Sequence, residues 1–137
     1  MYIIKMRDPN NPCLFCNTSK NEYELENEFA YASYDTYPVS KLHTLIVPKR
    51  HVKNYFELNE NEIVACNELI NLMKKKIDNL DQSVEGYNIG TNSGKVAGQS
   101  INHCHIHLIP RRKGDVDNPQ GGVRAVIASK QHYTRKD

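Results

Sequence analysis

The stretch "INHCHIHLIP" at residues 101–110 contains three of the six histidines of this 137-residue chain, spaced two apart. Side chains alternate between the two faces of a β-strand, so such spacing puts all three histidines on one face. The apolar residues between them would then share the other face, whereas on a helix both sets would be scattered around the axis. We therefore predict a strand over 101–110 that ends at Pro110 and carries His103, His105 and His107 on one side.

Three aligned histidines can hold a metal, perform catalysis or reflect a chance strand pattern. A purification tag is excluded because its histidines would be contiguous and terminal. Neighbours on one face of a strand lie about 6–7 Å apart, so the three cover about 13 Å. All three cannot reach one zinc ion at about 2 Å without a bend, although two adjacent ones can. At least one histidine is therefore left for other work, such as acting as a neutral nucleophile or general base.

Three further segments have the alternating pattern of strands. The stretches "EFAYASYDTYP" (28–38) and "KLHTLIVPKRH" (41–51) are separated by a short turn, which predicts an antiparallel hairpin. "GYNIGTN" (86–92) is a third candidate strand. In the C-terminal part, "NPQGGVRAVI" (118–127) predicts a turn followed by a short apolar run.

One long helix follows the hairpin. Asn59 is a suitable N-cap, and Glu62 occupies the capping-box position three residues later. Apolar residues repeat at steps of three and four and should form the buried stripe: Ile63, Cys66, Ile70, Met73, Ile77 and Leu80. Strands with short connections and a single long helix predict an α+β fold with an antiparallel sheet.

Length and composition limit the classes of function. A chain of 137 residues suits one domain, and a net charge of +2 gives no reason to propose a nucleic acid or a membrane as partner. The apolar run at the N-terminus is too short for a signal peptide, and no stretch reaches the roughly 18 apolar residues of a membrane helix. We therefore expect a cytoplasmic protein with reduced cysteines. Basic residues gather near the C-terminus, which indicates either a solvated edge or a nearby anionic substrate.

Two short motifs suggest chemistry. "CLFC" (13–16) has the spacing of two metal ligands, although two plain thiols or a thioredoxin-like motif without its usual strand–helix context are alternatives. "SGKVAGQS" (93–100) contains small residues that let backbone amides approach a phosphate closely. Its glycine spacing differs from that of a P-loop, and a plain hairpin turn is the simpler interpretation.

Taken together, these motifs resemble the histidine triad (HIT) family. The resemblance rests on "GQSINHCHIHLIPRRKGD" (98–115), "NSG" (92–94) and "HTLIVPKRH" (43–51). It implies a single HIT domain over 1–137, with a core at about 13–112 and a C-terminal extension at 113–137. It also implies a five-stranded antiparallel sheet with one long helix, and a homodimer in which the two sheets join. The continuation "PRRKGD" is more similar to the dinucleoside polyphosphate hydrolase branch than to the phosphoramidase branch.

The resemblance also implies a mechanism. His105, the middle histidine, would attack the α-phosphorus of a nucleotide and form a nucleotidyl-histidine that water then hydrolyses. Gln99 and Ser100 would contact the phosphate oxygens or the bridging atom, and His107 would assist at the phosphate. His43 matches a further family histidine that supports the site.

Further residues are assigned to nucleotide binding by the same resemblance. Asn92 would bind the phosphate and ribose end, and Asp35 would hold the ribose hydroxyls. Phe29 or Tyr31 would border the base.

Some HIT proteins carry a structural zinc ion, and the resemblance implies the ligands Cys13, Cys16, His51 and His103 here. Such a site uses only one histidine of the triad and leaves the other two for catalysis. A closed Cys2His2 site would be structural and would tie the N-terminal segment to the sheet.

Four functions are compatible with the sequence. The first is hydrolysis of dinucleoside polyphosphates such as diadenosine tetraphosphate to a nucleoside monophosphate and the remaining nucleotide. The second uses the same histidine but cleaves a nucleoside phosphoramidate. The third is a nucleotide-binding module with little turnover. In the fourth, the histidines form a catalytic zinc centre.

Overall fold

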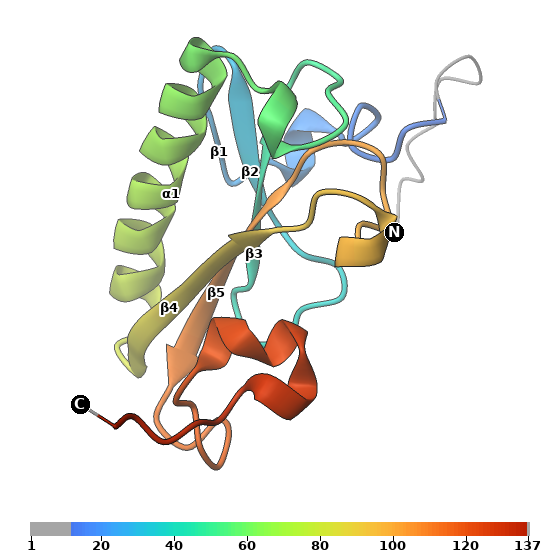
Figure 1. The fold of residues 1–137 in the computed structure, drawn as a ribbon. Helices are drawn as coiled ribbons and strands as arrows, with labels where there is room; N and C mark the ends of the chain where they lie inside the picture. Colours follow the sequence, from blue (N-terminus) through green and yellow to red (C-terminus); the bar gives the residue numbers. More distant parts are fainter. Residues whose placement is uncertain (1–11, 137) are drawn as a thin grey trace.

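The computed structural model describes residues 12–136 and contains one antiparallel five-stranded sheet, in the order β1-β2-β3-β5-β4, packed against one helix (Figure 1). The elements are β1 (Leu25–Glu26), β2 (Ala30–Tyr34), β3 (Thr44–Pro48), α1 (Glu60–Leu80), β4 (Val84–Thr91) and β5 (Ile106–Arg112). Short 3-10 turns are η1 (Lys20–Glu22), η2 (Tyr55–Glu57), η3 (Lys95–Ala97), η4 (Gly122–Val126) and η5 (Ala128–Lys130). The predicted α+β class with an antiparallel sheet and one helix is confirmed.

The predicted capping box begins α1. The side chain of Asn59 accepts the backbone N–H of Glu62, and the Glu62 carboxylate accepts the backbone N–H of Asn59, both at 2.9 Å. Arg50 binds the same carboxylate at 2.7 and 3.0 Å, and this contact lowers the pKa of the buried Glu62. The cap therefore also fixes the helix to the segment that follows β3.

The buried stripe of α1 differs in part from the predicted one. Ala65 and Leu69 are buried although they were not predicted, whereas Ile63 and Leu80 are 40% and 60% exposed and Ile70 is only partly buried. At 3.6 residues per turn, Ile63 lies about 100° around the helix from the buried Glu62, so it points sideways. Leu80 is the last helical residue. The stripe that contacts the sheet consists of Ala65, Cys66, Leu69, Met73 and Ile77.

The two faces of the sheet have different roles. The predicted hairpin is confirmed, since β2 and β3 pair antiparallel from Ala30 opposite Pro48 to Tyr34 opposite Thr44. One face packs on α1 through Ala30, Ala32, Ile46, Ile106 and Leu108. The other face carries His107, which lies opposite Leu45 on β3.

The prediction of a strand over 101–110 was wrong at both ends. Pairing begins only at Ile106, and residues 101–105 approach the sheet as a loop, in which Cys104 donates its N–H to the carbonyl of Val52 at 2.8 Å. The strand also continues beyond Pro110 to Arg112. Proline is tolerated there because pairing with β3 ends at Leu108, so Pro110 has a neighbouring strand on one side only.

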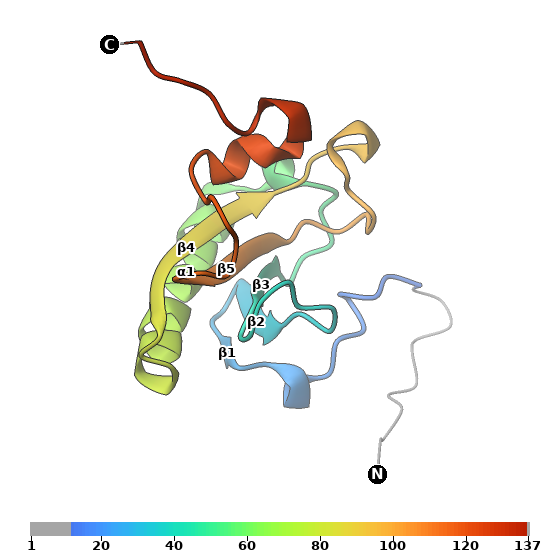
Figure 2. The same cartoon turned by 90° about the horizontal axis from the view of Figure 1, so that it is seen from below.

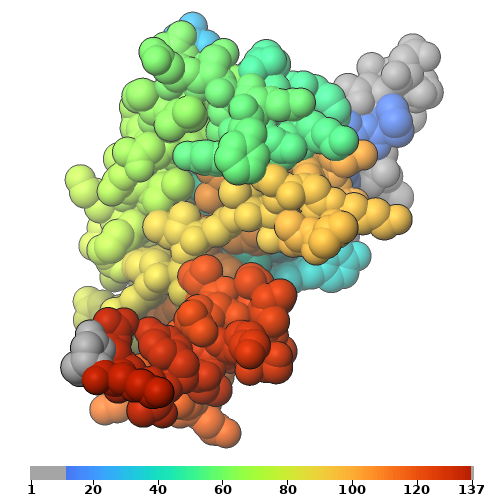
Figure 3. Space-filling view, viewed as in Figure 1, coloured from blue at the N-terminus to red at the C-terminus, as the bar shows by residue number. Residues whose placement is uncertain are grey.

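The chain turns back after β5. Residues 113–136 fold into η4, η5 and an extended end, and this segment lies beside β4 and β5 in both ribbon views (Figures 1 and 2). In the space-filling view it forms a continuous surface with β4 (Figure 3). Within residues 12–136, no helix is long and apolar enough to cross a membrane. The expectation about a signal peptide concerns residues 1–11, which lie outside the described range.

Candidate active site

His105 is held in an orientation that suits a nucleophile. Its Nδ1 lies 2.9 Å from the carbonyl oxygen of His103. A carbonyl can only accept, so Nδ1 carries a proton, and in the neutral ring Nε2 keeps its lone pair. The Phe15 ring packs 4.9 Å from the imidazole, and the hydroxyl of Thr91 donates to the carbonyl of His105 at 2.7 Å. These contacts fix the ring, which is only 8% exposed.

A chain of hydrogen bonds sets the tautomers of the other two histidines. The backbone N–H of Val39 donates to His43 Nδ1 at 3.1 Å, so neutral His43 carries its proton on Nε2. His43 Nε2 lies 2.9 Å from His107 Nδ1 and therefore donates to it. His107 must then carry its own proton on Nε2, where it is a hydrogen-bond donor.

Burial keeps this pair of histidines neutral. Desolvation above all, with smaller effects of the neighbouring His105 and His43, lowers the pKa of His107 from 6.5 to about 4, against an opposing effect of Asp35. Burial also lowers the pKa of His43, again opposed by Asp35. The Asp35 carboxylate lies 3.5 Å from His43 Nε2, and its other oxygen accepts the N–H of Tyr37 at 2.8 Å. At neutral pH the site therefore offers uncharged imidazoles beside one carboxylate.

Asp35, His43 and His107 also lie close enough to share a metal ion. The 2.9 Å separation of the two imidazole nitrogens is a hydrogen-bond distance. Two nitrogens bound to one tetrahedral zinc lie about 3.3 Å apart, given Zn–N bonds of about 2.0 Å. The geometry therefore favours a hydrogen-bonded relay in this group.

Cys13, Cys16, His51 and His103 meet on the same side of the sheet and can hold a metal ion. Each sulfur lies 3.3 Å from an Nδ1 atom, Cys13 from that of His103 and Cys16 from that of His51, and the two Nδ1 atoms are 3.1 Å apart. Ligand atoms of a tetrahedral zinc ion lie about 3.3–3.7 Å apart. His103 Nε2 donates to the carbonyl of Pro48 at 2.8 Å, which leaves Nδ1 to coordinate. The donor set fits zinc, and its four atoms lie close enough together to reach one ion.

The glycine-rich loop is shaped by Gln99. Its side-chain oxygen accepts the N–H of Gly94 at 2.9 Å, and its nitrogen donates to the carbonyls of Lys53 at 2.6 Å and Ile101 at 3.0 Å. Gly94 and Gly98 have φ angles of 97° and 93°, which other residues rarely adopt. The buried Gln99 thus braces the loop from inside, whereas Ser100 is exposed.

The structure does not bring every predicted residue to the histidines. Phe29 packs against the core on the α1 face of the sheet, away from His107. Tyr31 lies on the histidine face, but it is buried, and its hydroxyl donates to the carbonyl of Phe15 at 2.8 Å. Phe15 itself was not predicted. The only signal in the sequence was an aromatic residue between two cysteines, and its contact with His105 depends on the fold.

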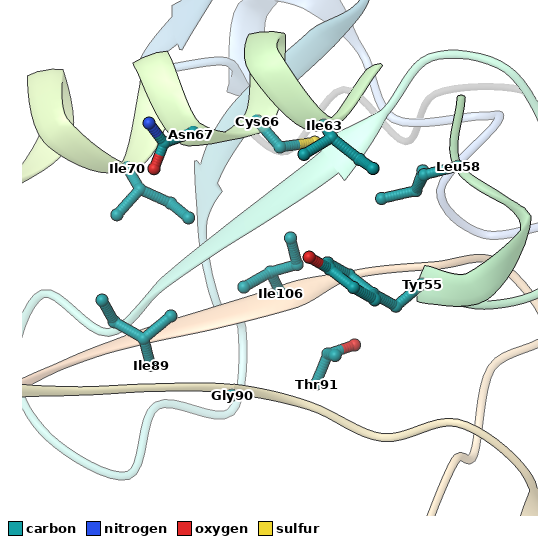
Figure 4. Close-up of a pocket in the computed structure, with 10 residues that line it drawn as sticks. All are labelled: Tyr55, Leu58, Ile63, Cys66, Asn67, Ile70, Ile89, Gly90, Thr91 and Ile106. Carbon is teal, nitrogen blue, oxygen red and sulfur yellow. The ribbon is translucent and has the colours of Figure 1, made fainter. Parts of the chain in front are cut away.

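Cavities lie on both faces of the sheet. One of ≈ 810 Å³ lies on the histidine face, where Asn92 and His107 form one side and the C-terminal segment forms the other. The second, of ≈ 260 Å³, lies between α1 and the edge strand β4. Its lining is Tyr55, Leu58, Ile63, Cys66, Asn67, Ile70, Ile89, Gly90, Thr91 and Ile106 (Figure 4).

Comparison with known proteins agrees with this geometry. Residues 18–114 match the model of the HIT domain. An uncharacterized HIT-like protein of Methanocaldococcus jannaschii is 41% identical over 75% of this chain and 81% of its own length. Adenosine 5'-monophosphoramidase of Schizosaccharomyces pombe is 32% identical over 72% of this chain and 74% of its own.

A similar arrangement is found among solved structures. Diadenosine triphosphate hydrolase of Plasmodium falciparum superposes with a TM-score of 0.67 at 28% sequence identity, covering 82% of this chain and 76% of its own. The sequence match extends from before β1 to the turn after β5 and includes His43, the glycine-rich loop and the histidine triad. The chain therefore belongs to the HIT domain family.

Proposed function

We propose that the protein hydrolyses nucleotides through a covalent nucleotidyl-histidine on His105, with dinucleoside polyphosphates such as diadenosine tetraphosphate as substrates. The observation that carries the proposal is the hydrogen bond from His105 Nδ1 to the carbonyl of His103, which leaves the Nε2 lone pair for attack. Two similar proteins are named as a phosphoramidase and a diadenosine triphosphate hydrolase, and both names describe cleavage at a nucleotide phosphate.

The reaction has two steps. The lone pair of His105 Nε2 attacks the α-phosphorus, an N–P bond forms, and the P–O bond to the leaving nucleotide breaks with the electron pair on oxygen. Water then attacks the same phosphorus, the N–P bond breaks, the electron pair returns to Nε2, and the water proton is lost to solvent. His107 donates from Nε2–H to a phosphate oxygen, where negative charge builds up in both transition states.

The remaining residues would position the substrate. Backbone amides of the 93–100 loop and the exposed Ser100 donate to phosphate oxygens, and Asn92 binds the phosphate and ribose end. Asp35 accepts from the ribose hydroxyls. Gln99 acts on the substrate through the loop, since its side chain already bonds Gly94, Lys53 and Ile101.

A structural zinc ion would be held by Cys13, Cys16, His51 and His103. When bound, it would supply a rigid cross-link between the N-terminal segment, the end of β3 and the loop before β5. Two contacts join this site to the nucleophile: Phe15 packs against His105, and the carbonyl of His103 orients its ring. The zinc would thus support catalysis without touching the substrate.

Turnover tests the proposal. Incubation with diadenosine tetraphosphate should release AMP and ATP in equal amounts, and His105→Asn should reduce kcat by at least about a thousandfold while retaining the cooperative unfolding of the wild type. A fully folded protein that binds this nucleotide and leaves it intact would instead indicate a binding module with little turnover.

A phosphoramidase is the second candidate, favoured by the similarity to the Schizosaccharomyces pombe enzyme. The same nucleophile would cleave a P–N bond, and the leaving amine would take a proton. The ratio of kcat/KM for diadenosine tetraphosphate to kcat/KM for adenosine 5'-monophosphoramidate distinguishes the two. We expect a ratio above one for the proposed hydrolase and a ratio far below one for a phosphoramidase.

We also propose that two copies pair across the edge strand β4. Within the described residues, β4 has β5 as its only neighbour in the sheet. The cavity beside it exposes apolar side chains from both layers, and Figure 4 shows Ile70 of α1 facing Ile89 of β4 across it. A second copy would satisfy the open backbone edge and cover these side chains.

A further inference from the structure

The C-terminal segment at residues 113–133 is anchored firmly to the sheet. The Asp115 carboxylate binds Arg111 through two bonds of 2.8 and 2.9 Å and accepts the backbone N–H of Arg112 at 3.0 Å. The same Arg111 side chain donates to Asn88 on β4 at 2.7 Å. These bonds join the segment to both β4 and β5 directly after the turn at Gly114.

The far end of the segment is closed on itself. Arg124 donates to the carbonyl of Lys130 at 3.0 Å, and its guanidinium stacks over the Tyr133 ring at 4.4 Å. Gly121 has a φ of 77°, and a Cβ there would collide with the carbonyl of Gln131. The loop is therefore shaped by polar bonds and a glycine, without burial of its own apolar side chains.

Two valines of this loop are exposed, although polar bonds hold the loop in place. Val123 is 66% exposed and Val126 is 81% exposed. Both line the ≈ 810 Å³ cavity, whose opposite side includes His107 and Asn92. The volume lies in the range of small-molecule sites, about 300–1,000 Å³. An apolar wall thus faces His107 and Asn92 across a space large enough for a nucleotide.

The position of the cavity indicates which half of the substrate it would take. During attack, the α-phosphorus lies between two groups. One is the nucleoside that is transferred to His105, and the other is the leaving group. Asp35, the proposed ribose ligand of the transferred half, is not among the lining residues of the cavity. The leaving group therefore has this space beyond Asn92 and His107.

We propose that residues 113–133 bind the leaving nucleotide of a dinucleoside polyphosphate. The base lies against Val123 and Val126, where His132 offers a polar contact, and the polyphosphate extends back toward Asn92 and His107. The inference rests on the proposed function and assigns the second half of its substrate. It also gives the motif "NPQGGVRAVI" a role, as the loop that presents an apolar wall to a base.

Two substrates with different leaving groups test the assignment. Diadenosine tetraphosphate loses a whole nucleotide, whereas adenosine 5'-monophosphoramidate loses only ammonia, which cannot reach the valines. We expect the double variant Val123→Ser, Val126→Ser to lower the ratio of kcat/KM for diadenosine tetraphosphate to that for the phosphoramidate about tenfold, mainly through KM. Both side chains are exposed, so the fold should tolerate the changes.

Val64→Ser is the matched control, because Val64 on α1 is 66% exposed, as is Val123, and lies outside the cavity. It should leave the ratio at the wild-type value. An equal fall of kcat/KM for both substrates in the double variant would make the loop merely structural and would overturn the inference, as would an unchanged ratio. If the wild type hydrolyses neither substrate, the proposed function itself fails, which is a different result from an active wild type with an insensitive ratio.

Discussion

A backbone amide four residues before His43 decides where His107 carries its proton. The N–H of Val39 occupies His43 Nδ1, His43 then donates from Nε2, and His107 is left with its proton on Nε2. Nothing in the sequence "HCHIH" indicates this tautomer, because it depends on the turn between β2 and β3. The spacing does predict which side chains share a face, since alternation is a local property of extended chain.

The burial of His107 predicts that the stability of the protein depends on pH. The pKa of His107 falls from 6.5 in the unfolded chain to about 4 in the fold, so the unfolded chain binds more protons between these values. The full contribution to stability is present above pH 6.5 and is lost as the pH falls toward 4. Urea titrations should show the free energy of unfolding decreasing over this window, by at most about 1.4 kcal/mol per pH unit for one group.

His107→Gln provides the comparison, because glutamine keeps a polar side chain without titrating. The variant should have a shallower slope between pH 6.5 and 4 and the same slope as the wild type above pH 7. Identical slopes over the whole range would show that His107 is not held neutral by the fold.

At the scale of elements, the "CLFC" segment contains two metal ligands and an aromatic residue that packs on the nucleophile. Removal of the metal should therefore loosen this segment first. With free zinc about a thousandfold above its Kd, a chelator should lower the free energy of unfolding by about 4 kcal/mol. Hydrogen exchange should increase at residues 12–18 before it increases in α1.

Cys16→Ser is the control for this experiment, since a chelator should have little further effect on a protein that has already lost one ligand. We expect kcat of the chelated wild type to fall in parallel with the loss of order around Phe15 and His105. If the chelator abolishes activity while residues 12–18 keep their protection from hydrogen exchange, the metal must act in catalysis at the triad histidines.

Elements whose signals are local were predicted well. The capping box of Asn59 and Glu62 and the hairpin of β2 and β3 were read from neighbouring residues. The start of β5 was not, because pairing requires a partner strand, and residues 101–105 lack one. The contact of Phe15 with His105 joins positions 90 residues apart in sequence, so only the fold reveals it.

For the molecule as a whole, the open edge of the sheet predicts the oligomeric state. We expect a dimer at micromolar concentration in sedimentation velocity, and Ile89→Asp should shift it to a monomer, because a charge would be buried in the interface. Ile89 is 50% exposed in the single chain, so the variant should remain folded as a monomer, and its thermal midpoint should no longer depend on protein concentration. A wild type that sediments as a monomer would contradict pairing across β4.

The placement of the C-terminal segment could not be predicted from the sequence. "NPQGGVRAVI" predicts a turn and an apolar run, and both are present as the Gly121 turn and η4. The pattern contains no information that the run returns to the histidine face, because the anchor is the pair Arg111 and Asp115 with Asn88 on another strand. Long-range polar bonds of this kind place the loop, and through it the large cavity.

The central claim is that His105 becomes covalently bonded to the phosphorus of the substrate. Protein quenched in acid-free denaturant during turnover of diadenosine tetraphosphate should, by mass spectrometry, carry one adenylyl group on the peptide that contains residues 101–111. Fragmentation should map the group to His105, and His105→Asn should carry none. An adduct on His103 or His107, or rapid turnover with no adduct under conditions in which phosphohistidine bonds survive, would contradict the account.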